Sequence, residues 1–184
     1  MNVKPVVIEN YNEDWPLRFS ELQKILREHL GDLALSIEHV GSTSVPGLAA
    51  KPIIDLDIVI DSMELLPQVI KNLNHLGYIH EGNLGVENRE AFARADDKVP
   101  YTRESYQKAE HHLYVCSKES DALFNHITFR DILRKQPELS EAYAILKKDL
   151  AEKYKHHRED YTKGKTEFVI KVLNEYKNFM NSVN

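Results

Sequence analysis

Two aspartates, Asp55 and Asp57, interrupt an apolar run that continues to Ile60. On a strand, residues two apart point to the same face, so these carboxylates would lie side by side. Their repulsion and desolvation cost stability unless a cation or a network of hydrogen bonds offsets them. Because no cysteine accompanies them, these hard oxygen ligands favour Mg²⁺ or Mn²⁺ over zinc. Asp55 and Asp57 are therefore candidate metal ligands.

A glycine-serine turn precedes the two aspartates. Gly41 leaves backbone N–H groups approachable because it has no side chain, and Ser42 adds a hydroxyl donor, which together suit a phosphate. Lys51 lies between this turn and the aspartates, where it could neutralise a phosphate or be an ordinary solvated lysine. A divalent cation beside a phosphate-binding turn is the arrangement that phosphoryl and nucleotidyl transfer require.

The composition is that of an ordinary globular protein, with 184 residues, 42% hydrophobic and 29% charged. We expect one domain over residues 1–184, divided into a sheet part at 1–117 and a helical part at 118–184. The formal charge of −5 argues against a surface that coats nucleic acid. Nucleic acid is therefore not an expected partner.

Cys116 is the single cysteine, which excludes an intramolecular disulfide and favours a cytoplasmic location. Its place in the apolar run LYVC indicates a buried thiol rather than a nucleophile. The N-terminal residues show no signal-peptide pattern, and no apolar run approaches the roughly 20 residues that a membrane helix needs. We therefore expect a cytoplasmic protein without a membrane partner.

The apolar periodicity predicts the elements that would position these residues. Repeats of three and four predict a helix that begins near Asp14 and ends at Gly31. The remaining pattern predicts strands at 33–40, 52–60 and 111–115, a helix between Ser62 and Gly77, and helices from Lys118 onward. This order indicates an α/β or α+β sheet with helices on at least one face.

The spacing of the central motif resembles a known superfamily. A Gly-Ser pair, a spacer of twelve residues and Asp-x-Asp within an apolar strand is the pattern of the nucleotidyltransferase (polymerase β-like) superfamily. The string EHVGSTSVPGLAAKPIIDLDIVI resembles the GrpB-like family of that superfamily, as do HHLYV, FRDILRKQPELSEAYAILKKDLA and DYTKGKTEF further along. The resemblance implies an α+β fold in which helices flank a mixed β-sheet and a helical half follows.

The resemblance also implies roles for individual residues. Gly41 and Ser42 would hold the β and γ phosphates, and Asp55 and Asp57 would bind the metals. A third carboxylate is expected on a later strand, but HHLYV carries no acid. Either Glu110 serves, or His112 replaces the carboxylate, or the third ligand is absent. Tyr161 and Lys165, in the block DYTKGK, would lie near the cleft.

Other polar residues allow plainer interpretations. His126 begins a His-Ile-Thr sequence that a histidine phosphoesterase would need twice, so the one copy in this helical stripe is interpreted as packing. The helical residues Arg130, Arg134, Lys147 and Lys148 are interpreted as solvated surface. Arg89 and Arg94 fall in a segment without clear periodicity, and either could reach a triphosphate.

Three functions are consistent with these patterns. The first is a Mg²⁺-dependent nucleotidyltransferase that binds a nucleoside triphosphate and transfers a nucleotidyl group to an unknown acceptor. Whether the chain is an enzyme depends on the third carboxylate, so the second is a nucleotide- or metabolite-binding module without catalysis. The third is a structural interaction protein whose Asp pair is satisfied by hydrogen bonds.

Overall fold

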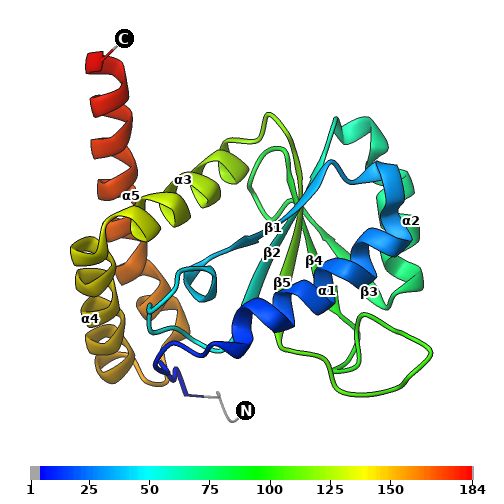
Figure 1. Ribbon diagram of the computed structural model, residues 1–184, viewed down its shortest axis with the longest axis horizontal. Helices are drawn as coiled ribbons and strands as arrows, with labels where there is room; N and C mark the ends of the chain where they lie inside the picture. Colours follow the sequence, from blue (N-terminus) through cyan, green and yellow to red (C-terminus); the bar gives the residue numbers. More distant parts are fainter. Residues whose placement is uncertain (1–4, 184) are drawn as a thin grey trace.

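A mixed five-stranded sheet forms the centre of the computed structural model, which describes residues 5–183 (Figure 1). The strand order is β1-β2-β5-β4-β3. β2 and β5 are parallel, and the other neighbouring pairs are antiparallel. The strands are β1 (Ser36–Val40), β2 (Ile54–Ile60), β3 (Tyr78–Gly82), β4 (Arg89–Arg94) and β5 (His111–Ser117).

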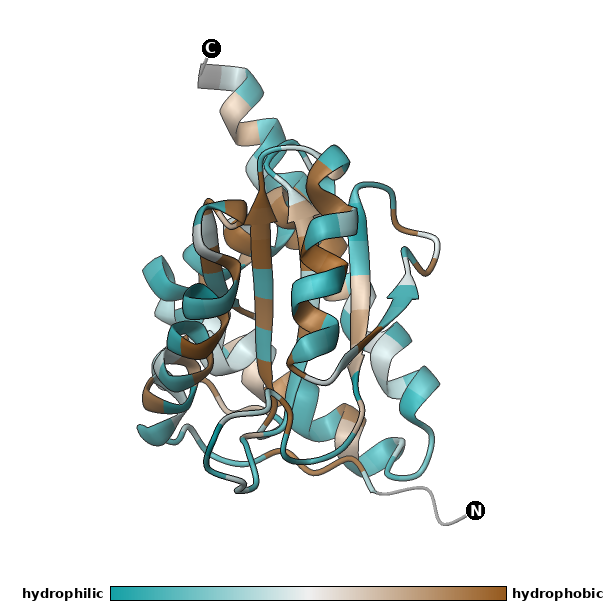
Figure 2. Ribbon diagram, turned by 90° about the vertical axis from the view of Figure 1, so that its right-hand side faces the viewer, coloured by the Kyte–Doolittle hydropathy of each residue, from teal (hydrophilic) through white to brown (hydrophobic). Residues whose placement is uncertain are grey.

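β2 presents two different faces. Leu56 and Ile58 belong to the main apolar cluster, whereas Asp55 and Asp57 point to the opposite face because side chains alternate along a strand. In Figure 2 this strand is brown apart from two teal bands. A central strand paired in parallel has both faces covered, so most of its residues are buried.

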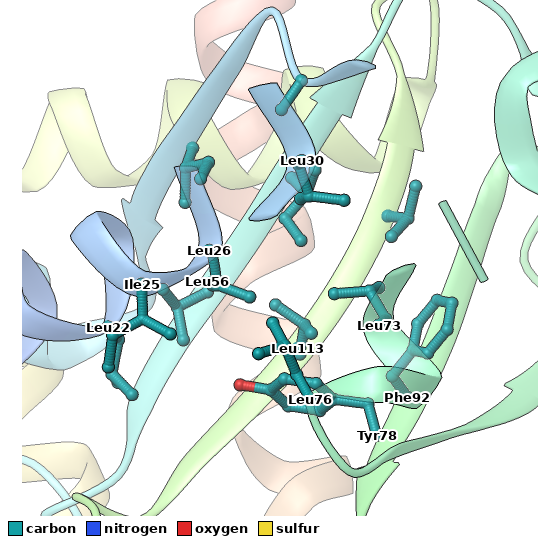
Figure 3. Close-up of a cluster of buried hydrophobic side chains, with 14 of the residues drawn as sticks. Leu22, Ile25, Leu26, Leu30, Leu56, Leu73, Leu76, Tyr78, Phe92 and Leu113 are labelled. Carbon is teal, nitrogen blue, oxygen red and sulfur yellow. The ribbon is translucent and has the colours of Figure 1, made fainter. Parts of the chain in front are cut away.

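Two N-terminal helices cover the apolar face of the sheet, which we call the core face. They are α1 (Asp14–Leu30) and α2 (Leu66–His75). The leucines of both helices meet Leu56, Leu113 and Phe92 of the sheet, as Figure 3 shows. Turns fix where these helices begin: Asn12 accepts a hydrogen bond from the Asp14 N–H at 2.8 Å, and Ser62 caps the short turn before α2.

Three C-terminal helices form a helical region beside the sheet (Figure 1). They are α3 (Asp121–Lys135), α4 (Pro137–Lys153) and α5 (Arg158–Val183). Leu123 and Ile127 of α3 pack on Val59 and Cys116, so α3 covers the face that carries the aspartates, which we call the site face.

The contact between α4 and α5 is close at one glycine. A Cβ at Gly164 would lie 2.6 Å from Leu150 Cδ2, so a larger residue there would push α5 away from α4. The first turns of α5 are thereby held against α4. Pro137 begins α4, where its missing N–H costs nothing because the first helical turn needs no N–H from proline.

The α+β fold expected from the sequence is confirmed, with a mixed sheet flanked by helices and a C-terminal helical region. Three strand boundaries were wrong. The strand expected at 33–40 begins at Ser36, because residues Gly31–Leu33 form a helical turn. Leu35 is 53% exposed as a result. The strand expected at 52–60 begins at Ile54, and the one expected at 111–115 continues to Ser117. No helix within residues 5–183 is long and apolar enough to cross a membrane.

Candidate functional site

A pocket of about 280 Å³ brings most of the predicted site residues together. It lies between the turn after β1, the strands β2 and β5, and the helices α4 and α5. We call it the lysine pocket. Its lining comprises Ser42, Thr43, Ala50, Lys51, Ile53, Asp55, His112, Tyr114, Lys147, Arg158, Tyr161, Thr162 and Lys165. Six of the residues to which a site role was assigned are in this lining, namely Ser42, Lys51, Asp55, His112, Tyr161 and Lys165, whereas Gly41 and Asp57 are outside it.

Gly41 lies directly against the carboxylate of Asp55. Its φ of +70° is a conformation that residues with a Cβ rarely adopt, and a Cβ there would lie 2.2 Å from Asp55 Oδ2. The turn that follows is closed by Ser44, whose Oγ and N–H both donate to the Gly41 carbonyl. Glycine is therefore required at this position so that the turn and Asp55 can approach one another.

Asp55 is oriented by His112 of the neighbouring strand. The two residues are opposite each other in the β2–β5 register, and His112 Nδ1 donates to Asp55 Oδ1 at 2.8 Å. Both side chains are partly exposed to the pocket. Because Nδ1 carries the donated proton, Nε2 is left to accept a proton in the neutral ring.

Asp57 lies beneath the pocket and is 0% exposed. His126 of α3 donates from Nδ1 to Asp57 Oδ2 at 2.7 Å. Burial lowers the pKa of His126, but the hydrogen bond and the charge of Asp57 outweigh burial and raise it. His126 therefore packs α3 on the sheet, as expected, but it does so through a hydrogen bond to a candidate site residue. Asp57 Oδ1 has no hydrogen-bond partner among the described residues, although a buried anionic oxygen is costly unless a cation or water meets it.

A third carboxylate faces the same side of the sheet, but it is engaged elsewhere. Glu38 of β1 is opposite Asp57 in the register, and Arg130 Nη1 donates to its Oε2 at 3.0 Å. Arg130 and His126 are four residues apart on α3 and so lie on one side of that helix. Arg130 was expected to be solvated surface, and its contact with Glu38 shows that this was wrong. Glu110 precedes β5, is exposed and lies outside the lysine pocket.

Four cationic side chains line the lysine pocket. Burial together with the charge of Lys165 lowers the pKa of Lys51 to about 8 and that of Lys147 to about 7. Burial also lowers the pKa of Lys165 itself. The fourth cation, Arg158, begins α5 at the exposed rim. The pocket is therefore suited to an anion, which would favour the charged form of each lysine.

The ring of Tyr161 contacts the ammonium groups of two of these lysines. Lys51 Nζ and Lys165 Nζ lie 4.5 and 4.7 Å from the centroid of its ring, which is within the range of cation–π attraction. Tyr161 is 1% exposed, and burial raises the pKa of its hydroxyl. Its ring therefore serves as a rigid support that keeps the two cations near each other.

Lys147 was expected on a solvated surface, and that interpretation was wrong. It is 2% exposed, and its Nζ donates to the carbonyl of Ala49, in the segment that leads to Lys51. Tyr143 and Ala151, four residues away on either side, are also buried, which places Lys147 on the inner side of α4. The four-residue spacing to Tyr143 and Ala151 was the feature of the sequence that could have predicted a buried Lys147. Lys148 is exposed and lies outside the lysine pocket, as expected.

Arg158 was not considered from the sequence. It is three residues before Tyr161 and seven before Lys165, the spacing of one helix face, so the signal was present once residue 158 is known to begin a helix. The arginines Arg89 and Arg94 lie outside the lysine pocket. Arg89 stacks on the Tyr114 ring at 4.5 Å. His39 bonds Thr43 and stacks on Phe19, which is a structural role.

Asp55 and Asp57 carry oxygen donors of the chemical type that Mg²⁺ prefers. No three His, Cys, Asp or Glu side chains gather to hold an ion within residues 5–183. Mg²⁺ usually takes one or two carboxylates and completes its coordination with substrate phosphates and water. The unpartnered Oδ1 of Asp57 and the Asp55 carboxylate at the pocket are donors of this kind. A second cation would lack a third carboxylate.

Comparisons with known proteins agree with this architecture. A protein-family model described as GrpB protein matches residues 5–175. The Glutamate-rich protein GrpB of Alkalihalophilus pseudofirmus is 32% identical over 176 residues, which are 95% of this chain and 98% of that protein. The crystal structure of conserved protein GrpB from Enterococcus faecalis has a TM-score of 0.71 at 28% identity, covering 91% of this chain and 99% of that chain.

A more distant likeness is to the Cid1 poly(U) polymerase with MgGTP bound, with a TM-score of 0.52 at 15% identity over 79% of this chain and 44% of that chain. At this identity the likeness concerns the fold alone. The sheet and helices thus define a protein with a nucleotidyltransferase-like fold. Within that class, the chain belongs to the GrpB family.

Proposed function

We propose that this protein binds a nucleoside triphosphate with Mg²⁺ or Mn²⁺ in the lysine pocket and transfers a nucleotidyl group to a hydroxyl-bearing acceptor. The observation that supports this most is the convergence of Asp55, Ser42 and four cations on one pocket. Carboxylates for a divalent ion, a hydroxyl and cations for phosphates are the groups that such a transfer requires. The nucleotidyltransferase-like fold adds a precedent at the level of architecture.

Each group has a role in the proposed reaction. Lys51, Lys147 and Lys165 would bind the outer phosphates, with Ser42 beside them at the Gly41 turn. Asp55 and Asp57 would hold the divalent cation, which supplies charge neutralisation at the phosphates when it is bound.

The proposed reaction also assigns a path for the proton. The acceptor oxygen attacks the α-phosphorus, pyrophosphate leaves, and the hydroxyl proton passes to His112 Nε2. Asp55 fixes the tautomer that makes this possible, because its carboxylate can only accept a hydrogen bond from Nδ1–H. His112 thereby takes the place of the third carboxylate. A cytoplasmic setting, expected from the single cysteine, is part of the proposal.

A nucleotide-binding module without catalysis is the second candidate. The observation that favours it is the engagement of Glu38 by Arg130, which leaves no third carboxylate within residues 5–183 for an acceptor-side cation. In this alternative the lysine pocket binds the same ligand and His112 only orients Asp55. The two candidates therefore differ in turnover and agree in binding.

Calorimetric titration with ATP, CTP, GTP and UTP, each with and without Mg²⁺, tests the shared part. We expect at least one nucleotide to bind, and Mg²⁺ to tighten binding to the wild type but not to Asp55→Asn. Asp61→Asn is the matched control, since Asp61 is an exposed carboxylate just past β2. Equal Mg²⁺ gains in wild type and Asp55→Asn would remove the metal-ligand role. Release of pyrophosphate with candidate acceptors then separates the enzyme from the binding module.

A further inference from the structure

The four cations of the lysine pocket share an unusual property. None of Lys51, Lys147, Arg158 and Lys165 forms an ion pair with a carboxylate in the part of the chain that the structure describes. Like charges kept close together without a partner repel one another, and a buried ammonium is costly to desolvate. Such a group is stabilised when an anion enters between its members.

Two of these cations are also fixed in position before any ligand binds. Lys147 is 2% exposed and is held by the carbonyl of Ala49. Lys165 follows Gly164, where α5 packs closely on α4, and lies over the Tyr161 ring. Cations that are already in place lose little conformational entropy when a ligand binds, so the pocket is preorganised for an anion.

We propose that the lysine pocket binds a chain of phosphates that carries no metal ion. The side-chain cations of the pocket would neutralise the phosphates, as a divalent ion otherwise does. The triphosphate would bind first, and the cation would then join it at Asp55 and Asp57. The location of this site rests on the proposed function, but the order of binding does not follow from it.

Charge complementarity supports this order. The pocket sets four cationic side chains against the single carboxylate of Asp55. A triphosphate without Mg²⁺ keeps all of its negative charges, which complement this excess of positive charge before any cation joins. Asp57 lies outside the lining, and His126 pairs with its Oδ2, which reduces the repulsion that Asp57 exerts on an anion in the pocket.

The same chemistry is offered by two ligands, a nucleoside triphosphate and inorganic tripolyphosphate. They differ in whether a nucleoside contributes to affinity. Titrations of ATP and of tripolyphosphate into the wild-type protein, each in EDTA and in excess Mg²⁺, separate these sources. The expected result is that ATP binds in EDTA with an affinity within about 10-fold of that in Mg²⁺, which corresponds to about 1.4 kcal/mol.

Substitutions of individual lysines test which of them contribute to the affinity for ATP. Lys165→Gln and Lys51→Gln are each expected to weaken ATP binding in EDTA by about 10-fold or more, the effect of one lost charge-assisted hydrogen bond. Lys165→Arg retains the charge and is expected to retain most of the affinity. Lys163→Gln is the matched control, because Lys163 is exposed on the same turn of α5 and lies outside the pocket.

Asp55→Asn gives an effect of opposite sign. Removing the one carboxylate of the pocket should tighten ATP binding in EDTA, because the phosphates no longer meet a negative charge. Circular dichroism of every variant establishes that the fold is retained before affinities are compared.

The outcomes distinguish this inference from the proposed function. Binding that requires Mg²⁺ in the wild type overturns the metal-free order and leaves the proposed function standing. Lysine variants that match Lys163→Gln overturn it as well. Binding of tripolyphosphate but not ATP supports metal-free binding and contradicts the proposed function. If neither ligand binds in either condition, both proposals fail.

Discussion

The two faces of the sheet are covered by different kinds of contact, apolar packing on the core face and charged pairs on the site face. On the core face, α1 and α2 cover Leu56, Leu113 and Val115 with apolar side chains, and the contacts need no polar partner. On the site face, His126 and Arg130 of α3 pair with the buried Asp57 and the partly buried Glu38, so each carboxylate has a specific partner from another element. The carboxylates Asp57 and Glu38 are therefore held by specific pairs, next to the apolar contacts that α3 makes with Val59 and Cys116.

The polar groups of the site face indicate a role in ligand binding rather than in stability. A face built for stability alone would place apolar residues at Asp57 and Lys147, since replacing buried ionic groups by apolar ones is often neutral or stabilising. Instead, it retains an unpartnered carboxylate oxygen and a lysine whose charge is opposed by burial. These groups are expected to contribute to ligand binding at the expense of stability.

The largest effect should come from the core face. Leu56→Ala removes a fully buried side chain from the main cluster and should lower the free energy of unfolding by about 2–5 kcal/mol. Denaturant unfolding measures this, and calorimetry should show that the folded variant binds nucleotide as the wild type does. The neighbouring Asp55→Asn should do the reverse, with little change in stability and altered binding. Equal stability losses in both variants would contradict the division between the faces.

Gly41→Ala should have the next largest effect on stability, because the added methyl group would disrupt the close contact between the turn and Asp55. A Cβ would meet Asp55 Oδ2, and the φ of +70° adds backbone strain, so a loss of about 1–3 kcal/mol is expected together with weaker nucleotide binding. Gly47→Ala is the matched control: its φ is +80°, but nothing lies within 4 Å of its Cβ. If both variants lose affinity equally, strain rather than the Asp55 contact is the cause.

Lys147→Met should change the pH dependence of stability. The pKa of Lys147 is lowered to about 7 in the folded protein, so above that pH the unfolded state binds more protons and stability rises with pH toward 10. The slope from one such group is at most about 1.4 kcal/mol per pH unit. The stability of the wild type relative to Lys147→Met should therefore increase from pH 7 to 9. A flat difference, as expected for the exposed Lys148→Met, would contradict the burial of this charge.

The smallest effect concerns a group on the site face that takes no part in binding. Cys116 is fully buried, and burial raises the pKa of its thiol to about 12, so little reactive thiolate forms near neutral pH. Its reaction with a disulfide reagent at pH 8 should be slow and should track local opening of the fold. Fast reaction in the native protein would show that α3 does not cover this part of the sheet.

The sequence predicted the core face better than the site face, for a physical reason. Apolar periodicity is a local signal, so it located α1, β2 and most of the strands, and the isolated acids in β2 stood out against that pattern. The partners of those acids come from α3 and β5, brought close only by tertiary packing. His126 and Lys147 look like ordinary residues of an amphipathic helix until the helix is placed on the sheet.

The expected site residues had a mixed outcome for the same reason. Ser42, Lys51 and Asp55 lie within one short segment, and the structure brings them to the same pocket. Tyr161 and Lys165 reach it from more than a hundred residues away, and only the family resemblance indicated them. Arg158 could be predicted as a site residue only if the start of α5 were known. The roles of all these residues remain predictions that binding measurements must test.

Thermal unfolding of the wild-type protein with and without nucleoside triphosphate and Mg²⁺ tests whether the lysine pocket binds a nucleotide. A ligand at 100 times its Kd adds about 2.7 kcal/mol to stability, and each kcal/mol raises Tm by roughly 2–4 °C for a protein of this size. We expect Tm to rise by roughly 5–10 °C with at least one nucleotide, and this rise should be retained in Lys163→Gln and reduced in Lys165→Gln. No rise with ATP, CTP, GTP or UTP would contradict it.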